Sequence, residues 1–256
     1  MAWEFAQNMY GAPALVHERL QIGETCYVGQ IMCADYALGG IVEPGELAGA
    51  GPDATTALVG ICSAVRTSPT YTAAYQGDGG TYDTTQAAQV ANDPPGPTLI
   101  DMTVIRPGDI FKAPLKNVVI ATAPTVVTAT ATATAGLTVT HTGTAVTAPT
   151  SNFSTIYCRT GANRGQYRVI TTGGTKTQTL LNAFTYDPAI GDTFVCANIK
   201  VGYCNIDFTT DFLGIDINTS VSNHYEAYCW QLNLEEAGKE FALVSFSPQH
   251  IWAPHD

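Results

Sequence analysis

Short apolar and alternating runs separated by turn residues make up most of this chain. Runs rich in valine, isoleucine, threonine and aromatic residues occupy positions 25–33, 57–65, 98–105, 109–114, 166–172, 175–181 and 193–199. Glycine, proline, asparagine or aspartate lies close to the end of each run, as expected between strands. A period of two predicts strands, whereas an amphipathic helix needs a period near 3.6. The sequence therefore predicts an all-β protein with antiparallel strands and little helix.

The most informative stretch runs from 157 to 198. Its β-rich segments are separated by G-G and D-P-A-I-G-D, so we expect a compact antiparallel meander. Four of the eleven lysines and arginines fall within it, namely Arg159, Arg164, Arg168 and Lys176. The whole chain has a formal net charge of -11. A basic module is therefore predicted within an acidic protein.

One turn of this stretch has a sequence similar to that of an earlier turn, and we call this similarity the echo. Residues 106–113 read R-P-G-D-I-F-K-A, and residues 189–197 read A-I-G-D-T-F-V-C-A. In both, a Gly-Asp turn precedes a strand whose phenylalanine, Phe111 or Phe194, is expected to point to one face. Small β-barrels contain turns of this kind. Shared turn chemistry and a true duplication both explain the echo.

Two strands joined by a hairpin loop are predicted near the end of the sequence. The apolar runs are 225–234 and 240–246, and E-E-A-G-K lies between them. A helix over 225–239 is the competing interpretation, but the alternation that begins at Tyr225 fits a strand better. We expect these strands to return to the domain that contains the first half of the chain.

A threonine-rich segment, 122–150, contains twelve threonines in 29 residues. Alternation of threonine with alanine predicts a strand strongly but its register weakly, because neither face is bulky. A flexible linker is the alternative. The predicted organisation is an extended N-terminal arm over 1–24, a small β-barrel-like domain over 25–121 plus 200–256, and an inserted threonine-rich antiparallel β domain over 122–199.

Two segments are expected to contact a partner. Residues 1–20 show no sustained helical period, so an extended arm and a short helix both fit. Trp3, Phe5 and Tyr10 need burial, either on a neighbouring subunit or on their own domain. Residues 68–97 are rich in turn sequences, and long loops in compact domains are usually functional or ordered by a partner.

Composition restricts the classes of function. Hydrophobic residues make up 45% of the chain and charged residues 13%, which suits a surface that packs against neighbours. The negative net charge argues against nucleic-acid binding, which requires clustered lysine and arginine. No apolar run reaches the ~18 residues of a membrane span, and the first ten residues lack the features of a signal peptide. Synthesis and folding in a cytoplasm are therefore expected, with no membrane partner.

The residues that leave local catalytic or metal-binding signatures do not form them here. The seven cysteines are odd in number and include no C-x-x-C pair, so buried free thiols are predicted. The five histidines lack the spacing of a metal site. The nucleophile elbow, the P-loop and the dinucleotide fingerprint are missing from the sequence. These patterns predict a protein without enzymatic activity, cofactor or metal.

Acidic residues offer two weaker alternatives. Glu235 and Glu236 are adjacent, so on a strand they would point to opposite faces, and a solvated hairpin tip is expected. A hydrolase would need two carboxylates from distant strands. A structural cation is the second alternative, although the oxygen ligands lack the spacing of a calcium loop. Those ligands are Asn205, Asp207, Asp211, Asp216 and Asn218.

The arginines of the basic module have a geometric interpretation. On a strand over 166–172, Arg168 shares one face with Gln166 and Ile170, which would present it to solvent or to an acidic partner. Arg159 and Arg164 come from the preceding turn. Ion pairing within the chain is the alternative, since exposed pairs form readily and contribute little.

Several segments resemble structural proteins of tailed bacteriophages, in particular head decoration (cement) proteins. They are V-G-Q-I-M, A-L-V-G-I-C, I-R-P-G-D-I-F-K-A-P and G-A-N-R-G-Q-Y-R-V-I-T-T with its G-D-T-F continuation. The resemblance covers the first 120 residues loosely and 157–197 more clearly. It implies small β-barrel or β-tulip domains on the capsid lattice, often as trimers, with a terminal arm that crosses capsomer boundaries. It implies no catalytic residues.

The expected function is that of a virion structural protein on the outer capsid surface, made in the host cytoplasm. Its partners would be the major capsid protein and copies of itself in a homotrimer. The alternative is a carbohydrate-binding or adhesin-type module, in which tyrosines of the 68–97 loop stack on sugar rings. Candidate contact residues are Trp3, Phe5, Tyr10, Tyr71, Tyr75, Tyr82, Arg159, Arg164 and Arg168.

Overall fold

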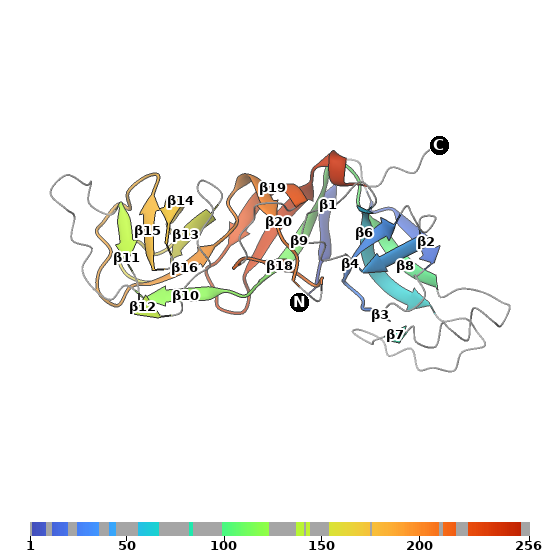
Figure 1. The fold of residues 1–256 in the computed structure, drawn as a ribbon, viewed down its shortest axis with the longest axis horizontal. Coiled ribbons are helices and arrows are strands. Elements are labelled where there is room, and N and C mark those ends of the chain that lie inside the picture. The colour runs from blue at the N-terminus through green and yellow to red at the C-terminus, as the bar shows by residue number, and fades with distance from the viewer. Residues whose placement is uncertain are drawn as a thin grey trace. The chain divides into compact units, whose positions relative to one another are not determined.

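The protein is all-β in its computed structural model (Figure 1). The described residues contain no α-helix, and their only helical turn is the 3-10 segment η3 (Pro248–His250). The predicted all-β class is therefore confirmed, while the barrel or tulip shape stays a prediction. No helix among these residues is long and apolar enough to cross a membrane. The structure describes residues 2–8, 12–19, 25–35, 41–44, 56–66, 82–83, 99–122, 137–140, 142–143, 154–174, 176–209, 212–218 and 225–251.

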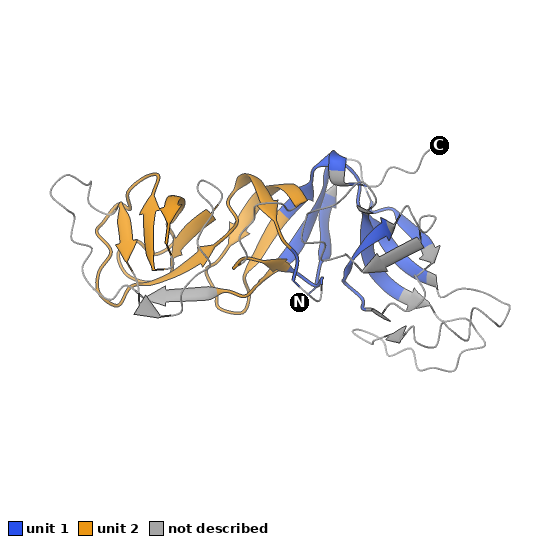
Figure 2. Ribbon diagram, viewed as in Figure 1, with its two compact units in different colours: residues 1–113, 208–214, 244–256 blue, residues 114–207, 215–243 orange. Residues whose placement is uncertain are grey.

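The chain divides into two compact units (Figure 2). Unit 1 comprises Met1–Ala113, Phe208–Gly214 and Val244–Asp256, and unit 2 comprises Pro114–Asp207 and Ile215–Leu243. Each unit is thus assembled from segments that are distant in the sequence. The predicted boundaries of an arm, a barrel-like domain and an insertion stay a prediction.

Unit 1 contains a five-stranded antiparallel sheet. Its order is β2 (Leu15–Arg19), β8 (Leu99–Val104), β6 (Thr56–Arg66), β4 (Ile31–Asp35) and β5 (Ile41–Pro44). Side chains from β4, β6 and β8 form its buried core because alternate residues of a strand share a face. The core consists of Met32, Ala34, Val59, Cys62, Ile100 and Met102, with Val16 against it.

The run predicted over 25–33 is divided into two strands. Its first part, β3 (Thr25–Cys26), pairs with β7 (Tyr82–Asp83), and β4 follows after a turn. Gly29 in this turn has φ +86°, and a Cβ built there would lie 2.2 Å from the Cβ of Ala2. The turn therefore requires glycine both for its backbone conformation and for space.

The N-terminal residues pack on unit 1 of the same chain. Strand β1 (Glu4–Asn8) pairs antiparallel with the first half of β9 (Asp109–Lys116). Trp3, just before β1, is 3% exposed. Its ring lies 5.8 Å, centroid to centroid, from the rings of both Phe208 and Phe246. Trp3 is therefore a core residue of its own unit.

Phe5 also packs against a residue of its own unit. Its ring meets that of Phe111 edge-on at a centroid distance of 5.8 Å. Of the two alternatives that the sequence left open for this segment, packing on its own domain describes both Trp3 and Phe5. Tyr10 lies outside the described residues.

Unit 2 contains a seven-stranded antiparallel sheet. The order is β11 (Thr138–Thr140), β15 (Thr177–Leu180), β14 (Tyr167–Gly173), β13 (Ser154–Cys158), β16 (Thr193–Ala197), β10 (Val119–Thr122) and β12 (Thr142–Gly143). Part of the threonine-rich segment thus forms strands at both ends of this order. The T-A-T-A alternation itself lies outside the described residues.

The predicted meander is correct for its first two runs, which form the neighbouring strands β14 and β15, and wrong for its third, which forms β16. Strands β13, β14 and β15 follow one another as neighbours, but β16 returns to pair with β13. The spatial order of these four strands is that of a Greek key. The return places Phe194 and Cys196 of β16 in one buried cluster with Ile156 and Cys158 of β13. Burial of this shared apolar face favours the pairing.

A third sheet has the order β1, β9, β20 (Phe241–Phe246), β19 (Tyr225–Asn233) and β17 (Gly202–Ile206). The short β18 (Ile215–Asp216) pairs in parallel with the end of β9. Strands β9 and β20 each contribute residues to both units. The two strands predicted near the end of the sequence are confirmed as β19 and β20, which are neighbours in the sheet and are joined by a short loop. The alternative of a helix is wrong.

The two echoing turns have the same structure. The carboxylate of Asp109 accepts a hydrogen bond from the Arg106 amide at 2.9 Å, and that of Asp192 accepts one from the Ala189 amide at 2.8 Å. Both aspartates are buried, and the glycine before each has φ between +86° and +89°. The strands that follow, β9 and β16, have different neighbours. Shared turn chemistry therefore explains the echo.

Candidate functional site

The loop 159–166, which carries Arg159 and Arg164, is held firmly in unit 2. Asn163 is fully buried, and its side-chain amide donates to the carbonyl oxygen of Tyr186 at 2.8 Å and accepts from the Tyr186 amide at 2.9 Å. Gly161 has φ +82°, and a Cβ there would lie 2.1 Å from Oδ1 of Asp192. The loop is therefore fixed against the connection between β15 and β16.

Arg159 forms a buried ion pair with Glu240. Its Nη2 contacts Oε1 of Glu240, and the two side chains are only 9% and 4% exposed. The Nε of Arg159 also donates to the carbonyl oxygen of Leu234 at 2.7 Å. Buried charges are tolerated when they are paired and hydrogen-bonded, as here. Pairing within the chain, the alternative left open by the sequence, describes this arginine.

Arg168 is directed differently from the prediction. It shares its face of β14 with Ile170, which is fully buried, so this is the inward face of the sheet. Its guanidinium carbon lies 5.1 Å from the ring centroid of Phe184, and its Nε donates to the Ala183 carbonyl at 2.7 Å. The expectation that Arg168 faces solvent is therefore wrong. Alternation gives the residues that share a face, but not which face the core covers.

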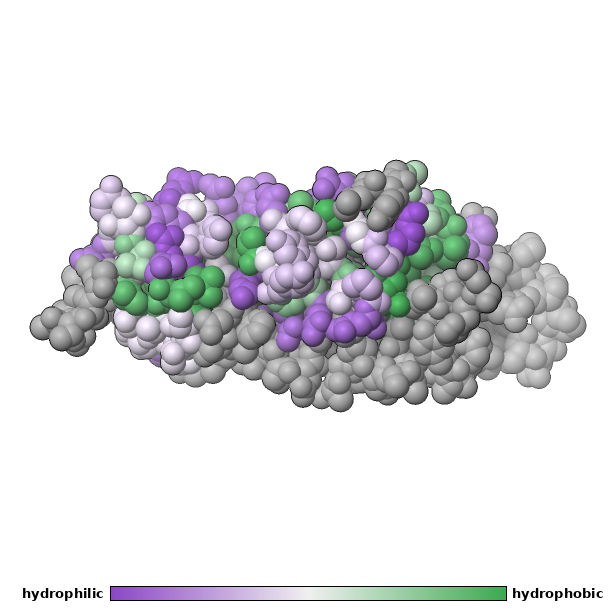
Figure 3. All heavy atoms as spheres, turned by 90° about the horizontal axis from the view of Figure 1, so that it is seen from above, coloured by the Kyte–Doolittle hydropathy of each residue, from purple (hydrophilic) through white to green (hydrophobic). Residues whose placement is uncertain are grey.

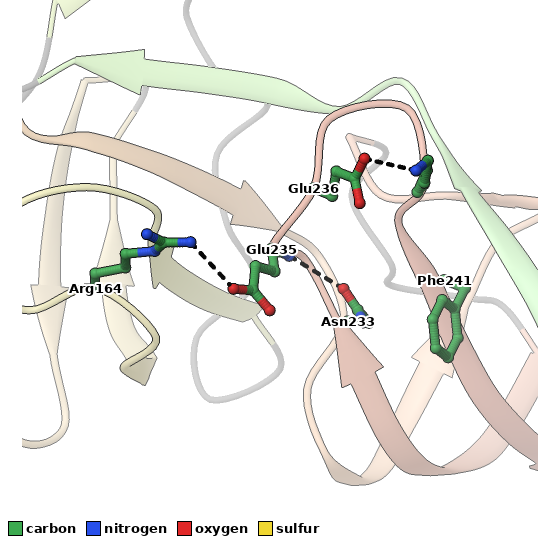
Figure 4. A pocket seen from close by; sticks show the side chains of 6 residues that line it. Arg164, Asn233, Glu235, Glu236 and Phe241 are labelled. Atoms are coloured by element: carbon green, nitrogen blue, oxygen red, sulfur yellow. Dashed lines mark hydrogen bonds and ion pairs between the residues drawn. The ribbon is translucent and has the colours of Figure 1, made fainter.

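Arg164 is the exposed member of the three arginines, and it borders a hollow of about 430 Å³ (Figure 4). Its Nη2 lies 3.4 Å from Oε1 of Glu235, while Glu236 pairs with Lys239 at 2.7 Å. All four side chains are at least 60% exposed, so these pairs contribute little to stability. The predicted solvated hairpin tip at Glu235 and Glu236 is confirmed. The hollow is lined by Arg164, Asn233, Glu235, Glu236, Lys239 and Phe241.

The pKa of Tyr157 in β13 is shifted by burial and by the charges of this region. Burial raises the pKa of its phenol, and the Glu235 carboxylate raises it further, while Arg164 and Arg159 act in the opposite direction. The phenol therefore stays protonated at neutral pH.

The six cysteines whose side chains are described are buried, and none of them forms a disulfide. Burial raises the pKa of Cys158 and Cys204 to about 11 and that of Cys196 to about 12. A raised pKa removes the thiolate form that nucleophilic and metal-binding cysteines require. Within the described part of the chain, no group of histidine, cysteine or acidic residues has the geometry to hold a metal ion.

A row of aromatic side chains lies on the exposed face of β17 and β19. Tyr203 is directly opposite Tyr228 across the two strands, and their rings meet edge-on at 5.1 Å. The ring of Trp230, two residues further along β19, lies 4.6 Å from that of Tyr228. Tyr203 is 81% exposed and Trp230 51%. We call Tyr203, Tyr228 and Trp230 the aromatic row.

A second apolar area lies around β14. Tyr167, Leu181 and Tyr186 are each more than half exposed. Leu181 donates its backbone amide to Val169 of β14, two residues from Tyr167. The hydroxyl of Thr185, next to Tyr186, donates a hydrogen bond to Gln166, the residue just before the same strand. We call Tyr167, Leu181 and Tyr186 the β14 surface. More generally, the face drawn in Figure 3 has hydrophobic side chains among hydrophilic ones.

The predicted contact residues are not brought together. Trp3 lies in the core of unit 1 and the half-buried Phe5 packs against Phe111, while Arg159 and Arg168 are engaged within unit 2. Among the predicted residues whose side chains the structure describes, only Arg164 is exposed. Tyr71 and Tyr75 lie outside the described residues. Tyr82 belongs to β7, and its side chain is likewise outside them.

Sequence reasoning missed both exposed apolar areas. The alternation of β19 correctly separates Tyr225, Ala227 and Cys229 from Tyr228 and Trp230. The alternation therefore indicated that Tyr228 and Trp230 share a face. The position of Tyr203 opposite Tyr228 depends on the pairing of β17 with β19, which local sequence does not determine.

Comparisons with protein-family models, with curated proteins and with solved structures gave no match.

Proposed function

We propose that this chain is a decoration (cement) protein of a tailed-phage virion, located on the outer surface of the capsid. It would bind the major capsid protein and copies of itself, as a homotrimer, and so stabilise the shell without catalysis or a cofactor. The sequence resemblance supports the proposal. Its clearest segment, G-A-N-R-G-Q-Y-R-V-I-T-T, corresponds to the fixed loop 159–166 and most of β14.

The β14 surface is the observation that carries the proposal. Tyr167, Leu181 and Tyr186 are 52%, 55% and 58% exposed on a well-packed Greek-key sheet. Large apolar side chains that gather on a surface mark interaction sites, and tyrosine is enriched at the centres of protein interfaces. The two hydrogen bonds between Asn163 and Tyr186 and the buried Arg159–Glu240 pair hold the neighbouring loop in place. A preformed surface of this kind loses little conformational entropy on binding.

The sparse charge fits repeated attachment to a lattice. Charged residues make up 13% of the chain, so steering by charge would be modest compared with shape and apolar contact. On a capsid the same contact recurs by symmetry, and linked copies bind with higher total affinity than one copy alone. Individually weak contacts are then sufficient. This removes the need for Trp3 and Phe5, which pack within unit 1, to act as anchors.

Sedimentation with capsids of the same phage that lack the protein tests this proposal. The native chain is expected to sediment with them, and the triple variant Y167A/L181A/Y186A should bind at least about tenfold more weakly, as interface centres do on truncation. Leu15→Ala is the matched control, because Leu15 is 65% exposed but lies on β2 in unit 1. Thermal unfolding should be nearly unchanged in both variants.

Two results would overturn different parts of the proposal. If the native chain stays in the supernatant, the decoration role is wrong. If the triple variant binds as tightly as the native chain, the role stands but the β14 surface is not the contact.

A further inference from the structure

The aromatic row has a chemistry of its own, distinct from that of the β14 surface. Its rings come from two paired strands and are not part of a loop. Five consecutive residue pairs join β17 to β19, from Gly202 opposite Cys229 to Ile206 opposite Tyr225. On the inward side, Tyr225, Ala227 and Cys229 are at most 5% exposed. The outward rings are therefore carried by a packed sheet and are held in place before any ligand binds.

Polar groups continue the same face of the sheet. Asn205 is directly opposite Glu226, and both are two residues from the Tyr203–Tyr228 pair, so alternation places all four side chains on one face. Tyrosine hydroxyls and the indole N–H add further hydrogen-bonding groups at the ring edges. The face thus presents ring surfaces followed directly by a carboxamide and a carboxylate.

We infer that this face is a binding site for a neutral oligosaccharide. A sugar ring offers C–H groups that pack on aromatic faces and hydroxyls that pair with amide and carboxylate oxygens, and this face provides both kinds of partner. Glu226 is the only charged residue in β17 and β19, on a protein of net charge -11, so an anionic sugar or a nucleic acid would be repelled.

The size of the row also favours a small ligand. With roughly 200 Å² for a fully exposed aromatic side chain, Tyr203 and Trp230 at 81% and 51% exposure present roughly 250 Å². A standard protein interface needs about 800 Å² on each partner. Two or three sugar units match the row, and the inclined rings, 89° and 54° between neighbours, suit a twisted chain of sugars.

This inference does not depend on the decoration role. It reaches the same ligand class as the carbohydrate-binding alternative drawn from the sequence, but through different residues. Tyr203, Tyr228 and Trp230 replace the tyrosines of the 68–97 loop as the stacking groups.

Calorimetric titration of the full chain tests the site. The probes are maltotriose, cellotriose, mannotriose and tri-N-acetylchitotriose, with sialyllactose as the anionic comparison. At least one neutral trisaccharide should bind with a Kd of about 1 mM or lower, and sialyllactose should bind more weakly. Tyr203→Ala and Trp230→Ala should each raise that Kd at least about tenfold, whereas Trp230→Phe, which keeps a ring, should raise it less.

Tyr186→Ala is the matched control, since Tyr186 is 58% exposed in the same unit but lies outside the row. It should leave sugar binding unchanged. The inference is wrong if no trisaccharide binds at about 10 mM, or if Tyr203→Ala and Trp230→Ala bind as the native chain does. It is also wrong if these two variants lose self-association or capsid binding while no sugar binds, because the row would then be a protein contact. Failure of sugar binding would leave the sedimentation test of the decoration role unaffected.

Discussion

Removal of the Arg159 side chain tests how unit 2 is held together. The Arg159→Ala variant leaves the carboxylate of Glu240, 4% exposed, without its cation, and leaves the carbonyl oxygen of Leu234 without the Nε donor. Breaking a buried ion pair on one side costs about 3 to 5 kcal/mol of unfolding free energy. We expect a loss in this range. Such a loss is a large fraction of the total unfolding free energy of about 5 to 15 kcal/mol that is typical of folded domains.

A second variant separates the cost of an unpaired charge from the value of the pair. Replacing both residues with apolar ones, as in R159M/E240L, removes the two charges together. Because each buried ion also loses its hydration in the native protein, this double replacement should cost less than Arg159→Ala alone. The coupling between the two positions should then exceed about 1 kcal/mol in a double-mutant cycle.

Urea unfolding with native-state hydrogen exchange of amides in β13 and β19 is the measurement, because exchange reports on unit 2 separately. Arg164→Ala is the matched control from the same loop. Its pair with Glu235 is at least 60% exposed, so its removal should cost about 0 to 1 kcal/mol. A loss below about 1 kcal/mol for Arg159→Ala would refute the reasoning, since it is the value of a solvated pair.

Three further predictions concern packing, backbone and thiols. Trp3→Ala should cost about 3 to 5 kcal/mol in urea unfolding, because the ring is 3% exposed, and no loss would place Trp3 outside the core. Gly161→Ala should destabilise by at least about 1 kcal/mol more than Gly165→Ala, because both have positive φ but only Gly161 lies against Asp192; equal losses would contradict this. Burial raises the pKa of Cys196 from near 9 to about 12, so the unfolded thiol ionises first and stability falls as pH rises between these values. Cys196→Ala should reduce that fall between about pH 9 and pH 11 in urea titrations, and an unchanged slope would exclude Cys196 as a cause.

Local patterns predicted the strands well. Runs at 57–65, 98–105 and 225–234 correspond to β6, β8 and β19 within one residue at each end. The alternation of β-branched and apolar residues, with turn residues between runs, is a local property and is readable from one sequence. The turn before each phenylalanine strand was also readable, because glycine and aspartate play the same part in both.

Pairing between distant strands was not readable in the same way. The return of β16 to β13 depends on burial of a face shared by residues about forty positions apart. Arg168 was placed on the wrong side because alternation does not say which face the core covers. The aromatic row needed the β17–β19 register, and a shift of one residue would turn Tyr203 inward.

Electron cryomicroscopy of capsids incubated with the purified chain tests the decoration role most directly. We expect symmetric density for the protein on the outer surface of the shell, with Tyr167, Leu181 and Tyr186 against a capsid subunit or a neighbouring copy. Capsids whose outer surface stays bare at a saturating concentration of the chain would contradict it.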